Sequence, residues 1–187
     1  MRIHPEVETF VEMWRYTLPW YITRNWPEQY SYPPSKDKVY GDYYGFLLGI
    51  RGVVSLGNND WDGKSADSLA HVAVVDKIEK LWRKGGGFFS YGRFIDNVGL
   101  NVTDPKILAK AYISRNSVAI PVWNTNGETV AFELNADLNA IFESGLKIKE
   151  VTSLEDNKHI PYKSADNNVV IRVQLPPHEI NVIVIEI

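Results

Sequence analysis

The sequence predicts an α+β protein, in which a helix-rich N-terminal segment is followed by a C-terminal antiparallel β-sandwich. The first observation is one long amphipathic helix pattern that stops at the glycine run 85–87. The second is composition, because five of the six tryptophans precede that run. The third is a series of short alternating segments after the run, separated by Asn, Asp, Gly and Pro as in antiparallel β-proteins. We therefore predict two domains, residues 1–86 and residues 87–187.

Composition and charge exclude several classes of function. The 187 residues are 44% hydrophobic, which is enough for one large core or two smaller ones. A net charge of −3 without a basic run predicts no binding to nucleic acid or to an acidic membrane surface. No stretch is apolar enough to span a bilayer, and the N-terminus carries no apolar signal segment. The absence of cysteine excludes disulfides and thiolate metal sites, but it leaves the compartment open.

The first part of the chain contains three weaker patterns. Residues 11–18 are rich in strand-forming residues and end before Pro19. Residues 24–38 contain three prolines, which indicates an ordered loop. Within residues 37–55, three glycines four positions apart would line one face of a helix. A strand ending at Leu56 is the alternative, since each glycine weakens a helix by about 1 kcal/mol relative to alanine.

The clearest helix runs from a Ser65 cap to Lys84. Asp67 lies in its first turn, where the helix dipole favours an anion, and Gly85 is the residue at which it ends. Its apolar stripe comprises Leu69, Val72, Val75, Ile78, Leu81 and Trp82.

Beyond residue 87, eight segments are predicted to be strands, because apolar residues alternate with polar ones between turn residues. Asn126-Gly127 predicts a tight turn, since both residue types accept positive φ. Pro176-Pro177 removes two backbone donors, so the chain must turn between the last two strands. The predicted strands are 88–90, 93–95, 108–114, 118–123, 129–134, 146–151, 168–175 and 179–187.

The C-terminal half resembles the all-β domain that closes many (β/α)₈-barrel glycoside hydrolases. The resemblance rests on the segments Ala119–Asn124, Glu128–Leu134, Ile148–Leu154 and Val169–Ile185. Residues 14–19, followed by the two predicted helices, are similar to the last βα units of such barrels, as in uncharacterised glycoside-hydrolase-like proteins of gut bacteria. The resemblance implies a carbohydrate-active protein, with a bacterial periplasmic or extracytoplasmic location for its full-length form.

Under this resemblance the chain is expected to be a C-terminal fragment. Eight βα units need about 200 residues or more, and fewer than ninety precede the predicted sandwich. Residues 1–86 would then be the remnant of a barrel, and the Met1–Pro5 start a cut or re-initiated end. The implied partners are the missing N-terminal barrel portion or a partner chain, and a carbohydrate. The isolated chain is therefore expected to be inactive.

Glycoside hydrolysis needs two carboxyl groups about 5 to 10 Å apart. Carboxylates in the first half are Glu12, Asp42, Asp60 and Asp62, and no pair among them is marked by spacing. Exposed, solvated carboxylates are the common case, so no catalytic residue is assigned.

Carbohydrate binding is the softer expectation, because aromatic rings pack on the apolar faces of sugar rings while polar groups bind hydroxyls. Aromatic side chains also fill cores, which is the more frequent role for each one alone. A non-catalytic carbohydrate-binding or structural accessory module is therefore the alternative function. The candidate substrate-binding residues are Arg15, Trp20, Asp60, Trp61 and Asp62, with Trp26, Tyr30 and Tyr32 as further loop aromatics.

No metal or cofactor is predicted. Residues 58–63 resemble the opening of a calcium loop, but the acid expected at its twelfth position is replaced by Leu69, so a polar turn is the better interpretation. The four histidines lack ligand spacing, and no phosphate-binding glycine loop follows a strand.

Overall fold

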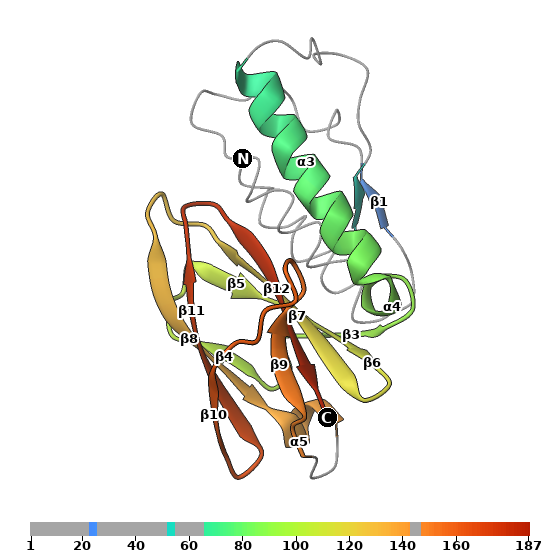
Figure 1. The fold of residues 1–187 in the computed structure, drawn as a ribbon, viewed down its shortest axis with the longest axis vertical. Coiled ribbons are helices and arrows are strands. Elements are labelled where there is room, and N and C mark those ends of the chain that lie inside the picture. Colours follow the sequence, from blue (N-terminus) through green and yellow to red (C-terminus); the bar gives the residue numbers. More distant parts are fainter. Residues whose placement is uncertain (1–22, 26–51, 55–65, 143–146) are drawn as a thin grey trace.

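The computed structural model describes residues 23–25, 52–54, 66–142 and 147–187. Within them the protein is a β-rich α+β structure, in which two antiparallel sheets face each other and one long helix covers an outer face (Figure 1). The α+β prediction is confirmed for this part. Most of the predicted N-terminal segment lies outside the described residues. No helix in the described part is long and apolar enough to cross a membrane.

The described helices are α3 (Ala66–Lys84), α4 (Gly86–Phe89) and α5 (Leu138–Phe142). The strands are β1 (Thr23–Asn25), β2 (Gly52–Val54), β3 (Arg93–Asp96), β4 (Leu100–Val102), β5 (Ile107–Ala109), β6 (Ala111–Ser114), β7 (Ser117–Asn124), β8 (Val130–Asp137), β9 (Glu150–Ser153), β10 (Tyr162–Ala165), β11 (Asn168–Leu175) and β12 (Ile180–Glu186).

Ten of these strands build the sandwich. The four-stranded sheet has the order β10-β11-β8-β4, and the six-stranded sheet has the order β3-β6-β7-β12-β9. Strand β5 also pairs with β7, along the half of β7 that β6 leaves open. The remaining pair, β1 and β2, is parallel, with Thr23 opposite Gly52. Parallel neighbours need a crossover connection, as consecutive strands of a βα barrel do.

The six-stranded sheet is buried on both faces, which explains the almost continuous apolar sequence of its central strands. In β12, Ile180 and Val182 face α3, whereas Ile183 and Ile185 face the four-stranded sheet. Successive side chains of a strand point to opposite faces, so the seven residues of β12 contribute side chains to the contacts with both layers. Strand β7 is divided between the two cores in the same way.

Asn124 connects two of the loops through which the chain passes between the sheets. Its side chain is fully buried, and its Nδ2 donates to the carbonyl oxygens of Glu128 (2.9 Å), Leu175 (3.1 Å) and Pro176 (2.8 Å). Its Oδ1 accepts a hydrogen bond from the Asn126 backbone N–H at 2.8 Å. One amide therefore fixes both the β7–β8 loop and the di-proline corner between β11 and β12.

The predicted Asn126-Gly127 tight turn is wrong. Strands β7 and β8 lie in different sheets, so the loop between them crosses the sandwich and closes no hairpin. Neither residue has positive φ. The two-residue turn with positive φ at both positions is instead Asp166-Asn167, which joins β10 to β11.

A proline explains why the predicted strand 108–114 is interrupted. Ala109 is opposite Val122 and Tyr112 is opposite Ala119, so the register places Lys110 opposite Pro121. The Lys110 N–H donates to the Pro121 carbonyl at 3.1 Å, but proline has no N–H to complete the pair. β5 and β6 are therefore one strand in register that is interrupted at this position.

Among the other predicted elements, the helix to Lys84 and the strand 168–175 are confirmed. Residues 88–90 are not a strand, because α4 brings Phe89 into the core. The predicted strand 146–151 is displaced to Glu150–Ser153, and the sequence did not indicate β4, β10 or α5. Near the N-terminus, residues 24–25 belong to β1 and residues 52–54 form β2, so the loop prediction does not hold at 24–25 and the helix prediction does not hold at 52–54, where a strand lies as in the alternative. The rest of both predicted segments lies outside the described residues.

We expect Asn124→Ala to lower the free energy of unfolding by about 2 to 3 kcal/mol, because carbonyl groups of both loops lose the hydrogen bonds of a fully buried amide. Asn124→Asp should cost at least as much, since a carboxylate would face the same carbonyl oxygens. Urea unfolding measures the effect. The exposed Asn101→Ala is the matched control and should change it by no more than about 0.5 kcal/mol. An equal loss in both alanine variants would contradict the role of Asn124.

Candidate functional site

The candidate site is the interface between helix α3 and the six-stranded sheet. Ile78 and Leu81 of α3 are 3% and 1% exposed and pack with residues of β6, β7 and β12. Residues of α4 and β3 complete the cluster. Its buried members are Ile78, Leu81, Phe89, Phe94, Tyr112, Ala119, Trp123, Ile180, Val182 and Val184.

Aromatic rings run from the helix to the edge of the sheet. Trp82 of α3 stacks on Phe89 of α4, with ring centroids 5.6 Å apart, and Phe89 meets the edge of Tyr112 at 5.4 Å. Phe94 of β3 lies 5.3 Å from Tyr112. Such pairs contribute about 0.5–1.5 kcal/mol each beyond their burial.

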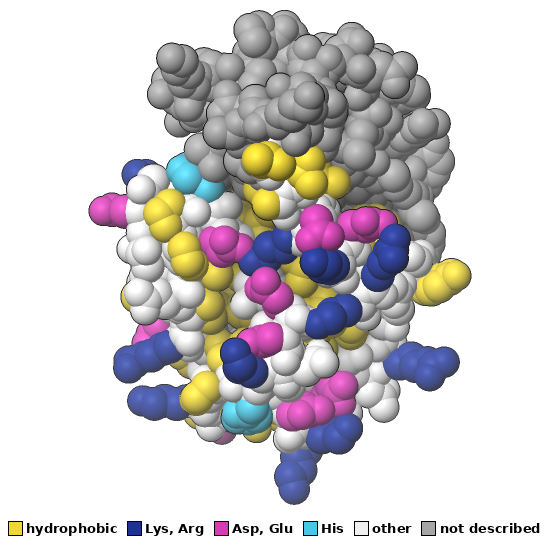
Figure 2. Space-filling model, turned by 45° about the horizontal axis from the view of Figure 1, so that its top comes forward, with side chains coloured by type: hydrophobic (Ala, Val, Ile, Leu, Met, Phe, Trp, Pro, Cys, Tyr) yellow, Lys and Arg dark blue, Asp and Glu magenta, His cyan; other side chains and the backbone are white. Residues whose placement is uncertain are grey.

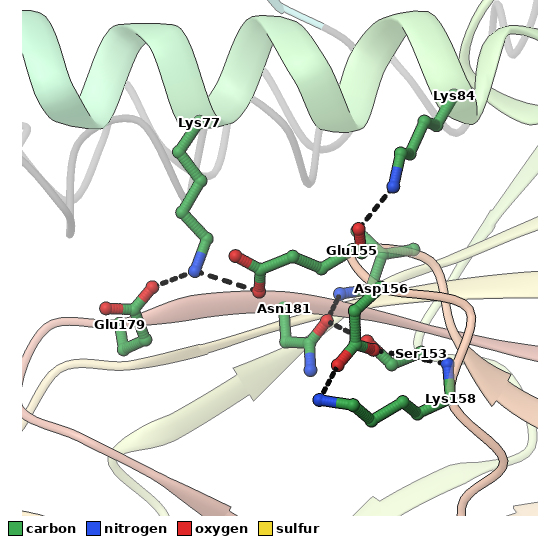
Figure 3. Close-up of polar contacts among 9 residues, drawn as sticks. Lys77, Lys84, Ser153, Glu155, Asp156, Lys158, Glu179 and Asn181 are labelled. Atoms are coloured by element: carbon green, nitrogen blue, oxygen red, sulfur yellow. Dashed lines mark hydrogen bonds and ion pairs between the residues drawn. The ribbon is translucent and has the colours of Figure 1, made fainter.

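Charged side chains also connect α3 to the sandwich (Figure 3). The Lys77 ammonium group pairs with the carboxylates of Glu155, at 3.1 Å, and of Glu179. Glu155 belongs to the loop after β9, and Glu179 lies just before β12. The Lys84 ammonium group donates to the backbone carbonyl oxygen of Glu155. Helix α3 is thus tied to two separate loops of the sandwich.

Further polar contacts order the loop that carries Glu155. Asp156 accepts from the Lys158 ammonium at 2.6 Å and from the Lys158 backbone N–H at 3.2 Å. These hydrogen bonds hold the pKa of the Asp156 carboxyl below its ordinary value of 3.8, and they raise the pKa of Lys158 above 10.5. The Ser153 hydroxyl lies 3.2 Å from Oδ1 of Asn181, which links β9 to β12.

The opposite side of α3 has a different character. Lys80 pairs with Asp76 and Arg83 with Glu79, both at 2.6 Å and both exposed. Such pairs one helical turn apart add only about 0.3–0.5 kcal/mol each. Figure 2 shows acidic and basic side chains interspersed over one face of the molecule. The predicted stripe is buried only in its C-terminal half, since Leu69 and Val72 are 54% and 40% exposed.

All five predicted substrate-binding residues lie outside the described residues, so their roles stay predictions: Arg15, Trp20, Asp60, Trp61 and Asp62. The same holds for Glu12, Asp42 and the loop aromatics Trp26, Tyr30 and Tyr32. Among the described residues, no three His, Cys, Asp or Glu side chains are grouped to bind a metal ion.

The sequence interpretation missed Lys77 and its acidic partners. One feature of the sequence could have indicated Lys77. It lies between Val74 and Ile78, on the apolar side of the helix rather than among the outer charges. Lys84 follows seven residues later on the same side. Long lysine side chains can cross an apolar surface and place the charge at its edge, which is what both do here.

We expect Lys77→Met to lower the free energy of unfolding by about 1 kcal/mol, because the carboxylates of Glu155 and Glu179 would then lose the cation that pairs with both. Lys80→Met is the control on the exposed side of α3 and should cost no more than about 0.5 kcal/mol. Urea unfolding in low and in 1 M salt should show the Lys77 effect shrinking with salt. Equal effects of the two substitutions would contradict the assignment.

The Asp156 carboxyl should titrate below pH 3.8 in a carbon-detected NMR titration. Because its pKa is lower when folded, the stabilisation is present above the unfolded value of 3.8 and is lost as pH falls through the folded pKa. Lys158→Met should move the midpoint up toward 3.8. A wild-type midpoint at or above 3.8 would exclude the proposed hydrogen bonds in solution.

Comparison with known proteins gives a likeness of fold. No protein-family model matches the sequence, and no curated protein matches it significantly. The structure is similar to a noncanonic maltogenic α-amylase from Thermotoga neapolitana, with TM-score 0.54, 15% identity, and 79% of this chain and 36% of that chain covered.

Two further glycoside hydrolases match less closely. An α-galactosidase I from Mortierella vinacea has TM-score 0.48 and 12% identity, with 80% of this chain and 36% of that chain covered. A family 30 xylanase from Clostridium acetobutylicum has TM-score 0.46 and 14% identity, with 89% and 42% covered. The chain therefore spans about 36% to 42% of the length of these three proteins. At such identity, the amylase likeness establishes that the chain shares a fold with part of that enzyme, and nothing finer.

Proposed function

We propose that this chain is the C-terminal portion of a carbohydrate-active, glycoside-hydrolase-like protein, and that its sandwich stabilises a catalytic barrel by packing against it. Helix α3 is the contact in this proposal: it belongs to the last βα unit and rests on the six-stranded sheet. The observation that carries the proposal is the buried cluster that joins Ile78 and Leu81 to Trp123 and Val182.

Two further observations support it. The parallel pairing of β1 with β2 is the pairing that successive βα units make. The chain shares its fold with 36% of a longer α-amylase, which leaves most of that enzyme without a counterpart here. The proposed partner is accordingly the missing N-terminal barrel portion, in the same polypeptide or as a separate chain. The bacterial origin and the carbohydrate ligand implied by the sequence resemblance belong to the same proposal.

The 187-residue chain should show no hydrolysis of a panel of aryl glycosides above the buffer rate. Joined to the sequence encoded immediately upstream, it should become active, because the barrel supplies the paired carboxylates that the reaction needs. Release of the aryl group is the measurement. Turnover by the 187-residue chain that disappears when a single carboxylate is replaced would overturn the fragment proposal.

A glycan array separates this proposal from the alternative of a binding module. Glycan binding by the 187-residue chain that is lost in Trp20→Ala or Trp61→Ala would favour the binding module. The exposed Tyr91→Ala provides the control, since it also removes an exposed ring, in a different part of the chain. An upstream reading frame that encodes no βα units would also count against the fragment proposal.

A further inference from the structure

The α3 interface is shielded from solvent as fully as the space between the two sheets. Leu81 on the helix is 1% exposed, and its neighbours Trp123 and Val182 on the sheet are 1% and 0% exposed. The core between the sheets has the same character, with Ile183 and Leu134 at 0%. Contacts between domains that move apart are usually more polar and less complete than this. The helix therefore packs as part of a domain core.

The segment that connects α3 to the sandwich is held by hydrogen bonds. Gly85 N–H donates to the Leu81 carbonyl at 2.8 Å, and Phe88 N–H donates to the Gly85 carbonyl at 2.8 Å. Gly92 N–H then donates to the Phe88 carbonyl at 2.8 Å. The backbone thus stays hydrogen-bonded from α3 through α4 to the start of β3.

Gly85 is needed there for close packing. A Cβ atom at this position would lie 2.4 Å from the Phe89 ring and 3.0 Å from the Leu154 side chain. Gly85 is itself buried. The absence of a side chain at this residue lets Phe89 enter the core, where it stacks on Trp82.

We propose that α3 from Val74 to Lys84, α4 and both sheets form one cooperative unit, so that no domain boundary lies at the glycine run 85–87. The inference rests on packing and does not depend on the carbohydrate-related function. It makes the contact between α3 and the sandwich a permanent one, which does not open at the glycines.

Hydrogen exchange in the full 187-residue chain tests this. Backbone amides of residues 74–84 should exchange in the same unfolding event as those of β7 and β12, because in one cooperative unit α3, β7 and β12 unfold together. Ile78→Ala should accelerate exchange at least about 30-fold in all three, the effect expected of a large truncation in a core. If this variant does not fold, Ile78→Val should give a smaller acceleration, again shared by all three elements.

Leu69→Ala is the matched control, since it truncates an apolar residue of the same helix that is 54% exposed. It should change exchange by no more than about 2-fold. Acceleration confined to α3 in the Ile78 variants, with β7 and β12 unchanged, would overturn the inference.

Limited trypsin digestion of the full chain gives an independent result. Lys84 is exposed and directly precedes the glycine run, so a linker at that point would offer trypsin an open bond. Every folded fragment that survives should contain both α3 and the sandwich. Accumulation of a folded fragment that begins at Gly85 would also overturn the inference.

Discussion

The burial of the six-stranded sheet on both faces is the constraint on which the rest of the structure depends. A strand with apolar residues on one face only could not hold α3 and the four-stranded sheet at once. In β12, Ile180 and Val182 pack on the side of α3, while Ile183 and Ile185 pack on the side of the four-stranded sheet. The proposed role of the sandwich rests on the packing of these few residues against two layers.

Local patterns predicted individual elements well, because helix periodicity, caps and alternation are properties of neighbouring residues. Helix α3 and strand β11 are examples, each placed to within about a residue. The pattern does not say which sheet a strand joins, so Asn126-Gly127 predicts a tight turn although the chain crosses the sandwich there. Two adjacent phenylalanines favoured a strand at 88–90, whereas burial of Phe89 beneath Trp82 requires α4.

The polar residues that connect distant elements were harder to predict, since their importance depends on partners distant in sequence. Asn124 donates hydrogen bonds to carbonyl groups more than fifty positions away, and Lys77 on the helix forms an ion pair with Glu179 of the sandwich. Asparagine is common in turns and lysine is common on helices, so the sequence alone does not mark either residue. The predicted substrate-binding residues, from Arg15 to Asp62, rest on the sequence alone because they lie outside the described residues.

The position of β12 along the chain has a consequence for folding. Its partner β7 ends at Asn124, and β12 begins only at Ile180, so their pairing closes a long loop. During synthesis, β7 would leave the ribosome well before the strand that fills the middle of its sheet. Until then, Trp123 and its neighbours are exposed to other unfinished chains. We therefore expect slow folding, governed by non-local pairing, and a need for chaperone protection while the central strand is still missing.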